Sequence, residues 1–254
     1  MTSTQNKLTT RVALVTGCSS GFGLLSAIEL AKSGFHVVAT MRDLARNQRL
    51  VEAAKQAGVE KLIDIRRLDV TEFDQVFTVV PNIIRDYGRI DALVNNAGIF
   101  FTKPFIDYTI EDYRRLAATN LEGFLHLTQR VVRQMLAQKR GGSIVSITTP
   151  MVDHPIAGVN ASVAMLTKGG IEALSKNIAM EYAKEQIRAN TVAPGVVDTP
   201  LHKDNPKDFL KTLSPMHSVS SVQEIVDAVL FLTEAPRITG ETLHVDGGAH
   251  LGRW

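Results

Sequence analysis

Glycines and serines near the N-terminus have the spacing needed to hold phosphate groups. They form the segment Thr16-Gly17-Cys18-Ser19-Ser20-Gly21-Phe22-Gly23, which directly follows an apolar run and opens a stretch of helical periodicity. There Gly17 would let the chain turn, Gly21 would let the backbone approach a pyrophosphate, and Gly23 would let the helix pack closely. The helix N-terminus would add N–H donors and partial positive charge. The segment predicts dinucleotide binding, with the spacing Gly-x-x-x-Gly-x-Gly; a glycine-rich turn without function is the alternative.

The end of the second apolar run bears on which nucleotide binds. It reads Ala39-Thr40-Met41-Arg42-Asp43. An acidic residue there accepts hydrogen bonds from the ribose 2′-hydroxyl of NAD, whereas arginine suits the 2′-phosphate of NADP. Met41 holds the acid position and Arg42 follows it, so NADP(H) is favoured and NAD(H) is the alternative. Arg46 is a second candidate contact, and Asp43 is expected to cap a helix. A solvated loop charge is the other interpretation of Arg42.

Seven short apolar runs, separated by longer segments of helical periodicity, must position these residues. Continuous apolar runs fit parallel strands that are covered on both faces of a sheet. Strict alternation of strand and helix predicts an α/β fold, a doubly wound Rossmann sheet of about seven parallel strands with helices on both faces. The predicted strands are Val12–Thr16, His36–Thr40, Leu62–Leu68, Ile90–Asn95, Ser143–Ile147, Ile187–Val192 and Glu241–Val245.

Composition limits the class of protein. A chain of 254 residues, 44% hydrophobic and 21% charged, is typical of one globular domain, here expected over residues 1–254. The net charge of +2 predicts neither nucleic-acid binding nor membrane attachment. The lone cysteine, Cys18, excludes an internal disulfide and a multi-cysteine metal site, and favours the reducing cytoplasm. The polar start, Met1 to Thr10, predicts no signal peptide.

Further motifs follow in order along the chain, and with the glycine segment they resemble the short-chain dehydrogenase/reductase family from about Arg11 to Gly248. The resemblance implies an NAD(P)(H)-dependent oxidoreductase. These motifs are Leu68-Asp69-Val70, Asn95-Asn96-Ala97-Gly98, Ala118-Thr119-Asn120, Pro194-Gly195 with Thr199, and His244-Val245-Asp246-Gly247-Gly248. No metal ligand is expected. In total, the residues expected to bind the cofactor are Gly17, Ser19, Ser20, Gly21, Phe22, Gly23, Arg42, Asp69, Val70, Asn96, Ala97, Gly98, Lys168, Pro194, Gly195, Val197 and Thr199.

The resemblance also assigns roles to these positions. Asp69 would hold the adenine ring, Asn95 would steady the sheet, and the Ala97-Gly98 backbone would lie along the cofactor. Pro194-Gly195 and Thr199 would touch the nicotinamide and its carboxamide.

The resemblance departs from the family at the proton donor. Family members carry a tyrosine four residues before a lysine, and the lysine lowers the tyrosine pKa and holds the ribose hydroxyls. Lys168 matches the lysine, but Ala164 stands at the tyrosine position. Asn120 matches the asparagine that anchors a water relay. Thr149, or alternatively Thr148, stands in for the serine that orients the substrate carbonyl.

Another group must then supply the proton, at a cost of about 10²–10⁴-fold in rate if none is positioned. Water held by Asn120, Lys168 and Thr149 is one source. His154 is a second, because imidazole titrates near neutral pH, although a surface loop histidine is the plainer interpretation. No tyrosine lies between Tyr113 and Tyr182.

Two functions follow from this pattern. The first is hydride transfer from NADP(H) to a carbonyl or quinone-like substrate with a non-standard proton donor. The second is a non-catalytic dinucleotide-binding protein, regulatory or structural. A substrate lid is expected at about residues 196–219, running from Leu201 to His217. A homodimer or homotetramer would form through two long helices, at about Ile110–Gln138 and Ala157–Ala183.

Overall fold

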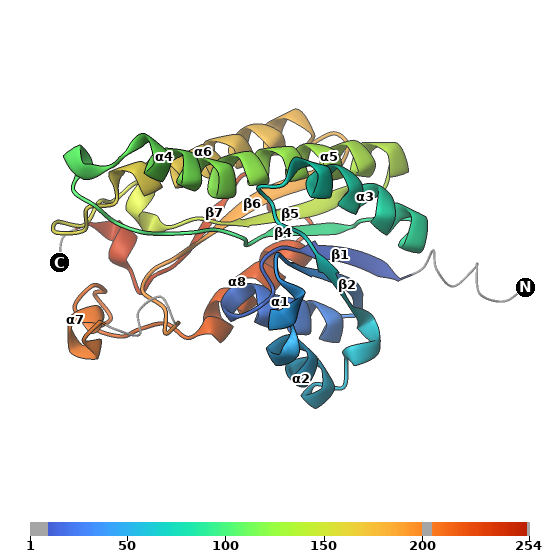
Figure 1. Ribbon diagram of the computed structural model, residues 1–254, viewed down its shortest axis with the longest axis horizontal. Helices are drawn as coiled ribbons and strands as arrows, with labels where there is room; N and C mark the ends of the chain where they lie inside the picture. Colours follow the sequence, from blue (N-terminus) through green and yellow to red (C-terminus); the bar gives the residue numbers. More distant parts are fainter. Residues whose placement is uncertain (1–9, 200–204, 253–254) are drawn as a thin grey trace, which may run out of the picture.

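One parallel sheet of seven strands forms the centre of the fold (Figure 1). The computed structural model describes residues 10–199 and 205–252. The strand order is β3-β2-β1-β4-β5-β6-β7, and every pair of neighbours is parallel. The predicted doubly wound fold is confirmed, and each strand lies within two residues of its predicted bounds. The strands are β1 Arg11–Val15, β2 Phe35–Met41, β3 Ile63–Arg67, β4 Ala92–Asn95, β5 Gly142–Ile147, β6 Ile187–Pro194 and β7 Thr242–Val245.

Helices cover both faces of the sheet. Alternate residues of β1 enter two separate apolar clusters, Ala13 and Val15 on one face, Val12 and Leu14 on the other. This division explains why the strands read as continuous apolar runs. Figure 1 shows α1, α2 and α8 below the sheet and α3, α5 and α6 above it. Their bounds are α1 Gly21–Lys32, α2 Gln48–Gln56, α8 Val222–Glu234, α3 Phe73–Tyr87, α5 Gly123–Gln138 and α6 Ser162–Glu181.

The two long helices expected above the sheet differ from prediction. The first is α4, Ile110–Leu116, continued into α5 by a π-helical segment, η5, over Ala117–Glu122. The second begins at Ser162 and not at Ala157, because Gly158 has a φ of +86°, which a right-handed helix does not allow.

Short elements gather where the strands end. The carboxyl ends of the strands point to one side of the molecule, at the left of Figure 1, where α7 also lies. Neighbouring helices on opposite faces leave a crevice at this edge in doubly wound sheets. The short elements of the fold are α7 Lys207–Lys211 and the 3₁₀ turns η2 Leu44–Arg46, η3 Glu60–Leu62, η4 Phe105–Asp107, η6 Pro150–Val152 and η8 Ala249–Leu251.

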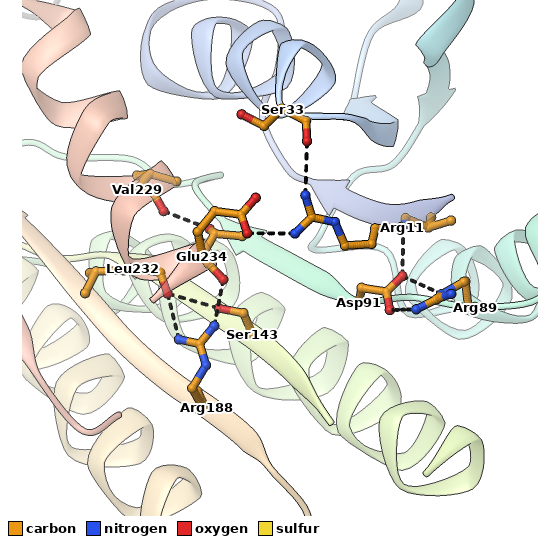
Figure 2. A network of polar contacts seen from close by, with 11 residues as sticks. Arg11, Ser33, Arg89, Asp91, Ser143, Arg188, Val229, Leu232 and Glu234 are labelled. Carbon is orange, nitrogen blue, oxygen red and sulfur yellow. Dashed lines mark hydrogen bonds and ion pairs between the residues drawn. The ribbon is translucent and has the colours of Figure 1, made fainter. Parts of the chain in front are cut away.

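The opposite, amino edge of the sheet is closed by a polar network (Figure 2). Arg188 donates to three backbone oxygens: Leu232 O at 2.7 Å, Thr233 O at 2.6 Å and Ile238 O at 3.2 Å. Its guanidinium thus satisfies carbonyls at the C-terminal end of α8, which lack partners within the helix. Burial lowers the pKa of Arg188.

A second part of the same network joins β1 to its neighbours. Asp91, just before β4, accepts from Val12 N at 2.8 Å and pairs with Arg89. Arg11 donates to Glu234 at 2.7 Å and to Ser33 O at 3.0 Å.

No helix within residues 10–199 and 205–252 is long and apolar enough to cross a bilayer.

Candidate active site

The glycine segment forms a tight turn between β1 and α1. Gly17 and Gly21 have φ angles of +73° and +59°, in the left-handed region that favours glycine. A Cβ on Gly23 would lie 2.5 Å from Gly17 O and 2.4 Å from Asn96 Nδ2, so the turn leaves no room for a side chain there. Ser20 is the N-cap of α1 but makes no side-chain cap bond. The first N–H groups of α1 are therefore left to bind an anion.

Thr16 and Asn96 hold this turn against β4. Asn96 Nδ2 donates to Thr16 O at 2.8 Å and to Gly17 O at 3.1 Å. Thr16 Oγ1 accepts from the backbone N–H of Asn96 and of Ala97, at 3.0 and 2.9 Å. The Asn96 side chain thus supports the glycine turn. Thr16 is a further residue of this site that the predicted set lacks, and a threonine at a strand end just before the turn glycine is a usable signal for it.

The end of β2 presents two arginines to solvent. Met41 is buried, whereas Arg42 and Arg46 are both exposed. Asp43 accepts from Ala45 N at 3.0 Å and caps η2, as predicted. Neither arginine is held by the fold in a way that would keep it from a phosphate.

The segment expected to hold the adenine ring follows β3. Asp69 accepts from the backbone N–H and the hydroxyl of Thr71, at 3.0 and 2.8 Å. Val70 is partly buried and packs against Gly123, where a Cβ would lie 2.8 Å from Val70 Cβ. The predicted pair therefore sits in an ordered turn beside the start of α5.

The Lys168 side chain lies close to Gly98, in the loop that follows β4. Its Nζ donates to Ile147 O at 2.8 Å, at the end of β5. A Cβ on Gly98 would lie 3.5 Å from Lys168 Nζ and 3.3 Å from Asn120 Oδ1. The residue is partly exposed, yet its amine lies deep enough that desolvation lowers the pKa of Lys168 to about 8. The predicted lysine, asparagine and loop glycine therefore meet at one point.

Asn120 positions the backbone here. Its Oδ1 accepts from Ile99 N at 2.9 Å, and its Nδ2 donates to Ile99 O at 3.0 Å and to Thr167 Oγ1 at 3.1 Å. These bonds occupy both polar atoms of the buried amide. Beside it lies a cavity of about 10 Å³, room for one water molecule, which Lys168 and Thr16 also line.

The structure separates the two threonines that follow β5. Thr148 is buried directly after β5 and donates to Glu172 Oε1 of α6 at 2.7 Å. Burial raises the pKa of Glu172. Thr149 is partly exposed and is the N-cap of η6, accepting from Met151 N at 3.4 Å. Thr149 is therefore the hydroxyl that stands at the open edge.

The groups considered as proton donors lie in different surroundings. Ala164 is fully buried in α6, and its carbonyl accepts from Thr167 Oγ1 at 2.8 Å. The Tyr108 hydroxyl is shared among Phe101 O, Asn160 O and Lys103 N, at 3.1 to 3.3 Å. His154 is exposed, and within residues 10–199 and 205–252 no side chain is hydrogen-bonded to its ring.

The segment after β6 packs on the end of β7. A Cβ on Gly195 would lie 2.7 Å from Asp246 Cβ, so these two backbones touch. Pro194 and Val197 are buried, and only Gly195 and Thr199 are partly exposed among the four residues predicted here.

The segment expected to form a lid is described only in part. Its second half rests on Gly247, whose carbonyl accepts from Ser214 Oγ and Met216 N, both at 3.3 Å. Leu201 lies outside the described residues.

Among residues 10–199 and 205–252, no group of three or more histidine, cysteine, aspartate or glutamate side chains is arranged to hold a metal ion.

Comparisons with known proteins agree with this geometry. A family model described as enoyl-(acyl carrier protein) reductase matches residues 17–250. A 3-oxoacyl-[acyl-carrier-protein] reductase from Thermotoga maritima is 34% identical over 247 residues, 95% of this chain and 98% of that protein. A solved structure of ElxO with NADP bound has a TM-score of 0.88 at 27% identity, covering 94% of this chain and 98% of the other. A tyrosine-to-phenylalanine variant of ElxO with NADPH bound has a TM-score of 0.87 at 27% identity and the same coverage. The chain therefore belongs to the short-chain dehydrogenase/reductase family of NAD(P)-dependent oxidoreductases.

Proposed function

We propose that this protein is an NADP(H)-dependent reductase of a carbonyl or quinone-like substrate that protonates its product without a tyrosine. The observation that carries the proposal is the convergence of Lys168 Nζ, Asn120 and Gly98 beside the glycine turn. A lysine with no role in the cleft would not be expected to hold a partly desolvated amine there, because burying an ammonium costs free energy.

The cofactor residues fit a dinucleotide. The turn around Gly17 and Gly23 leaves a cradle of backbone next to free N–H groups of α1, which suits a pyrophosphate. The exposed Arg42 and Arg46 suit a 2′-phosphate, which favours NADP(H) over NAD(H). Lys168 would hold the nicotinamide ribose. When bound, NADPH supplies a hydride to the substrate carbon, and the substrate oxygen must then gain a proton.

Thr149 is the residue that orients the substrate. Its hydroxyl stands at the open edge and can donate to a carbonyl oxygen, whereas that of Thr148 is taken by Glu172. The related 3-oxoacyl reductase is named for a ketone substrate, and a ketone is also the class that such a single donor can hold. Quinones suit the site for a second reason: their reduced anions need less immediate protonation.

The second candidate function is binding without catalysis, and Ala164 is the observation that favours it. The side chain at that position is a buried methyl group and has no proton to give. The ElxO tyrosine-to-phenylalanine variant is described with NADPH bound, so in a protein of this fold cofactor binding does not depend on every tyrosine hydroxyl.

One experiment separates the two functions. NADPH oxidation by the pure protein would be followed with ethyl acetoacetate, benzaldehyde and menadione, beside the variants Lys168→Ala and Ala164→Tyr. We expect the unmodified chain to reduce at least one probe and Lys168→Ala to lose that activity. Activity found only in Ala164→Tyr would overturn the proposal in favour of a binding protein.

We also propose that the protein forms a homodimer or homotetramer and works in the cytoplasm. Phe124 and Ile171, two apolar residues of the long helices proposed for the contact, are buried within the chain itself. Ile110 on α4 and Leu166 on α6 are instead 54% and 61% exposed, and these two helices touch. This pair of helices remains the proposed contact.

A further inference from the structure

A histidine–aspartate pair lies just beyond the end of β7. His250 Nδ1 is 3.0 Å from both carboxylate oxygens of Asp246. The His244 ring stacks on the His250 ring, with centroids 4.0 Å apart and planes 16° apart. The His250 side chain is 29% exposed, so one side of the ring faces inward and part of it reaches the surface.

The fold holds Asp246 firmly in place beneath the His250 ring. Asp246 is 4% exposed and also accepts from the backbone N–H of Gly248 and of His250, at 3.0 and 2.8 Å. Its backbone is locked against Gly195, where no Cβ would fit. With Nδ1 directed at the carboxylate, Nε2 lies on the opposite side of the ring and is left to other partners.

This pair sits beside the groups proposed to handle substrate. η8, which contains His250, packs on η6, which begins directly after Thr149. Gly247 on the same turn carries the described end of the lid, through Ser214 and Met216. Gly195, the expected nicotinamide contact, touches Asp246 itself.

We propose that His250, oriented by Asp246, is the catalytic acid that protonates the substrate oxygen in place of the missing tyrosine. The inference rests on the proposed reductase function. An aspartate that fixes a histidine tautomer through Nδ1 while Nε2 exchanges a proton is a recurring arrangement in acid–base catalysis.

The proton and electron count closes. As the substrate carbon gains the hydride, the electron pair of the carbon–oxygen π bond moves onto the oxygen. That pair takes the Nε2 proton of the His250 imidazolium, which leaves neutral imidazole. Solvent returns a proton to Nε2 through the exposed part of the ring, and the net products are an alcohol and oxidised cofactor.

The other groups near the cleft fit this role less well. The Tyr108 hydroxyl is committed to three backbone groups. The cavity beside Lys168 and Asn120 could hold a water molecule, but Thr149 is not among the residues that line it. His154 has the reach of a loop residue but no described side chain orients its ring.

Several charged groups surround the pair and would shape its response to pH. Asp246 and His244 face His250 directly, and Asp153 and His154 act on His244 from the loop after η6. Burial, and then the neighbouring His250, lower the pKa of His244. This favours a neutral His244 beside His250.

The test compares two isosteric variants, His250→Gln and His154→Gln, with His126→Gln as control. His126 lies on α5, where its ring packs against that of Phe73 on α3. With the best probe among ethyl acetoacetate, benzaldehyde and menadione, we expect His250→Gln to lose about 10²-fold in kcat. In the same variant, the fall in kcat at rising pH that follows from loss of an imidazole proton should disappear. The Kd for NADPH, measured by fluorescence, should stay unchanged.

Two further readouts separate chemistry from structure. Added imidazole should restore part of the activity of His250→Ala but not of His154→Ala. In histidine side-chain NMR of the cofactor-free protein, neutral His250 should carry its proton on Nδ1, and Asp246→Asn should abolish that preference.

Each result decides the inference. Loss of the pH dependence in His154→Gln with none in His250→Gln would overturn it, as would weaker NADPH binding in His250→Gln. If the unmodified chain reduces a probe and His250→Gln does so equally well, the inference fails and the proposed function stands. If the unmodified chain reduces none, the proposed function fails and the inference with it.

Discussion

The two edges of the sheet use charged residues in opposite ways. At the amino edge, the Arg188 guanidinium donates to backbone carbonyls, and Asp91 and Arg11 bond partly to backbone and partly to other charged side chains. At the carboxyl edge, Arg42 is exposed and Lys168 keeps a partly desolvated amine with a single backbone acceptor. One edge is built to hold the fold together, and the other leaves polar groups ready for a ligand.

The comparison predicts that substitutions at the two edges separate stability from binding. Damage at the amino edge should lower the free energy of unfolding and spare cofactor affinity. Substitutions at the carboxyl edge should lower cofactor affinity and spare the free energy of unfolding.

The largest effect is expected at Gly23. In Gly23→Ala the new Cβ would overlap Gly17 O and Asn96 Nδ2, so the phosphate turn must open. We expect NADPH affinity, measured by fluorescence titration, to fall by more than about 100-fold, because the turn and the helix N-terminus are proposed to bind the same pyrophosphate. Gly169→Ala is the control, since its Cβ would make only an ordinary 3.4 Å contact with Val152. Equal affinity in the two variants would contradict the proposed phosphate site.

Arg188→Met should give the largest loss of stability. It leaves the carbonyls of Leu232 and Thr233 without their charged donor, which is expected to cost about 2–4 kcal/mol. Urea unfolding measures this cost, and NADPH affinity should not change. Arg140→Met is the matched control, because Arg140 lies nearby with no partner among the described residues. A stable Arg188→Met that binds NADPH poorly would break the comparison between the edges.

The buried amine of Lys168 should make stability depend on pH. Its pKa is lowered from 10.5 to about 8 in the folded cofactor-free protein, so between these values the unfolded chain binds more protons. Stability relative to Lys168→Met should therefore rise with pH through this window, by about 1–3 kcal/mol allowing for partial exposure. Urea unfolding from pH 7 to pH 10 measures it. Leu174→Met, which changes no titratable group, should differ from the unmodified chain by a constant, and a constant difference for Lys168→Met as well would refute the desolvated amine.

The smallest effect is expected at Arg42. Removing one exposed cation from a 2′-phosphate should lower the preference for NADPH over NADH about tenfold in Arg42→Ala, or about 1.4 kcal/mol. Arg49→Ala, farther along α2, is the control. An unchanged ratio of the two affinities would leave Arg42 as a solvated loop charge.

The sequence predicted the sheet well because its signals are local. Seven apolar runs alternate with helical segments, and each strand was placed within two residues. The Asp43 cap was equally local. Thr148 and Thr149 stayed alternatives because Ser146, Ile147 and Thr148 are all buried, so no alternation along the strand marks where burial ends.

Other parts of the site depend on long-range contacts. Asn96 was assigned to the cofactor because its position matches a motif, but its amide bonds to a turn 80 residues away. The Asp246–His250 pair shows only a spacing of four in the sequence. The residues that surround it, η6 and Ser214, come from distant parts of the chain.

The π-helical segment between α4 and α5 has a geometric consequence for the whole upper layer. A π turn contains one residue more than an α turn, so residues before it are rotated by about 100° relative to one uninterrupted α-helix. Ile110 and Tyr113 of α4 therefore lie exposed while Leu127 and Val131 of α5 are buried. An alignment that treats residues 110–138 as a single helix would place the faces of α4 about 100° away from their true directions. Deleting one residue from Ala117–Glu122 would turn α4 by about the same angle and carry part of its outward face toward the sheet.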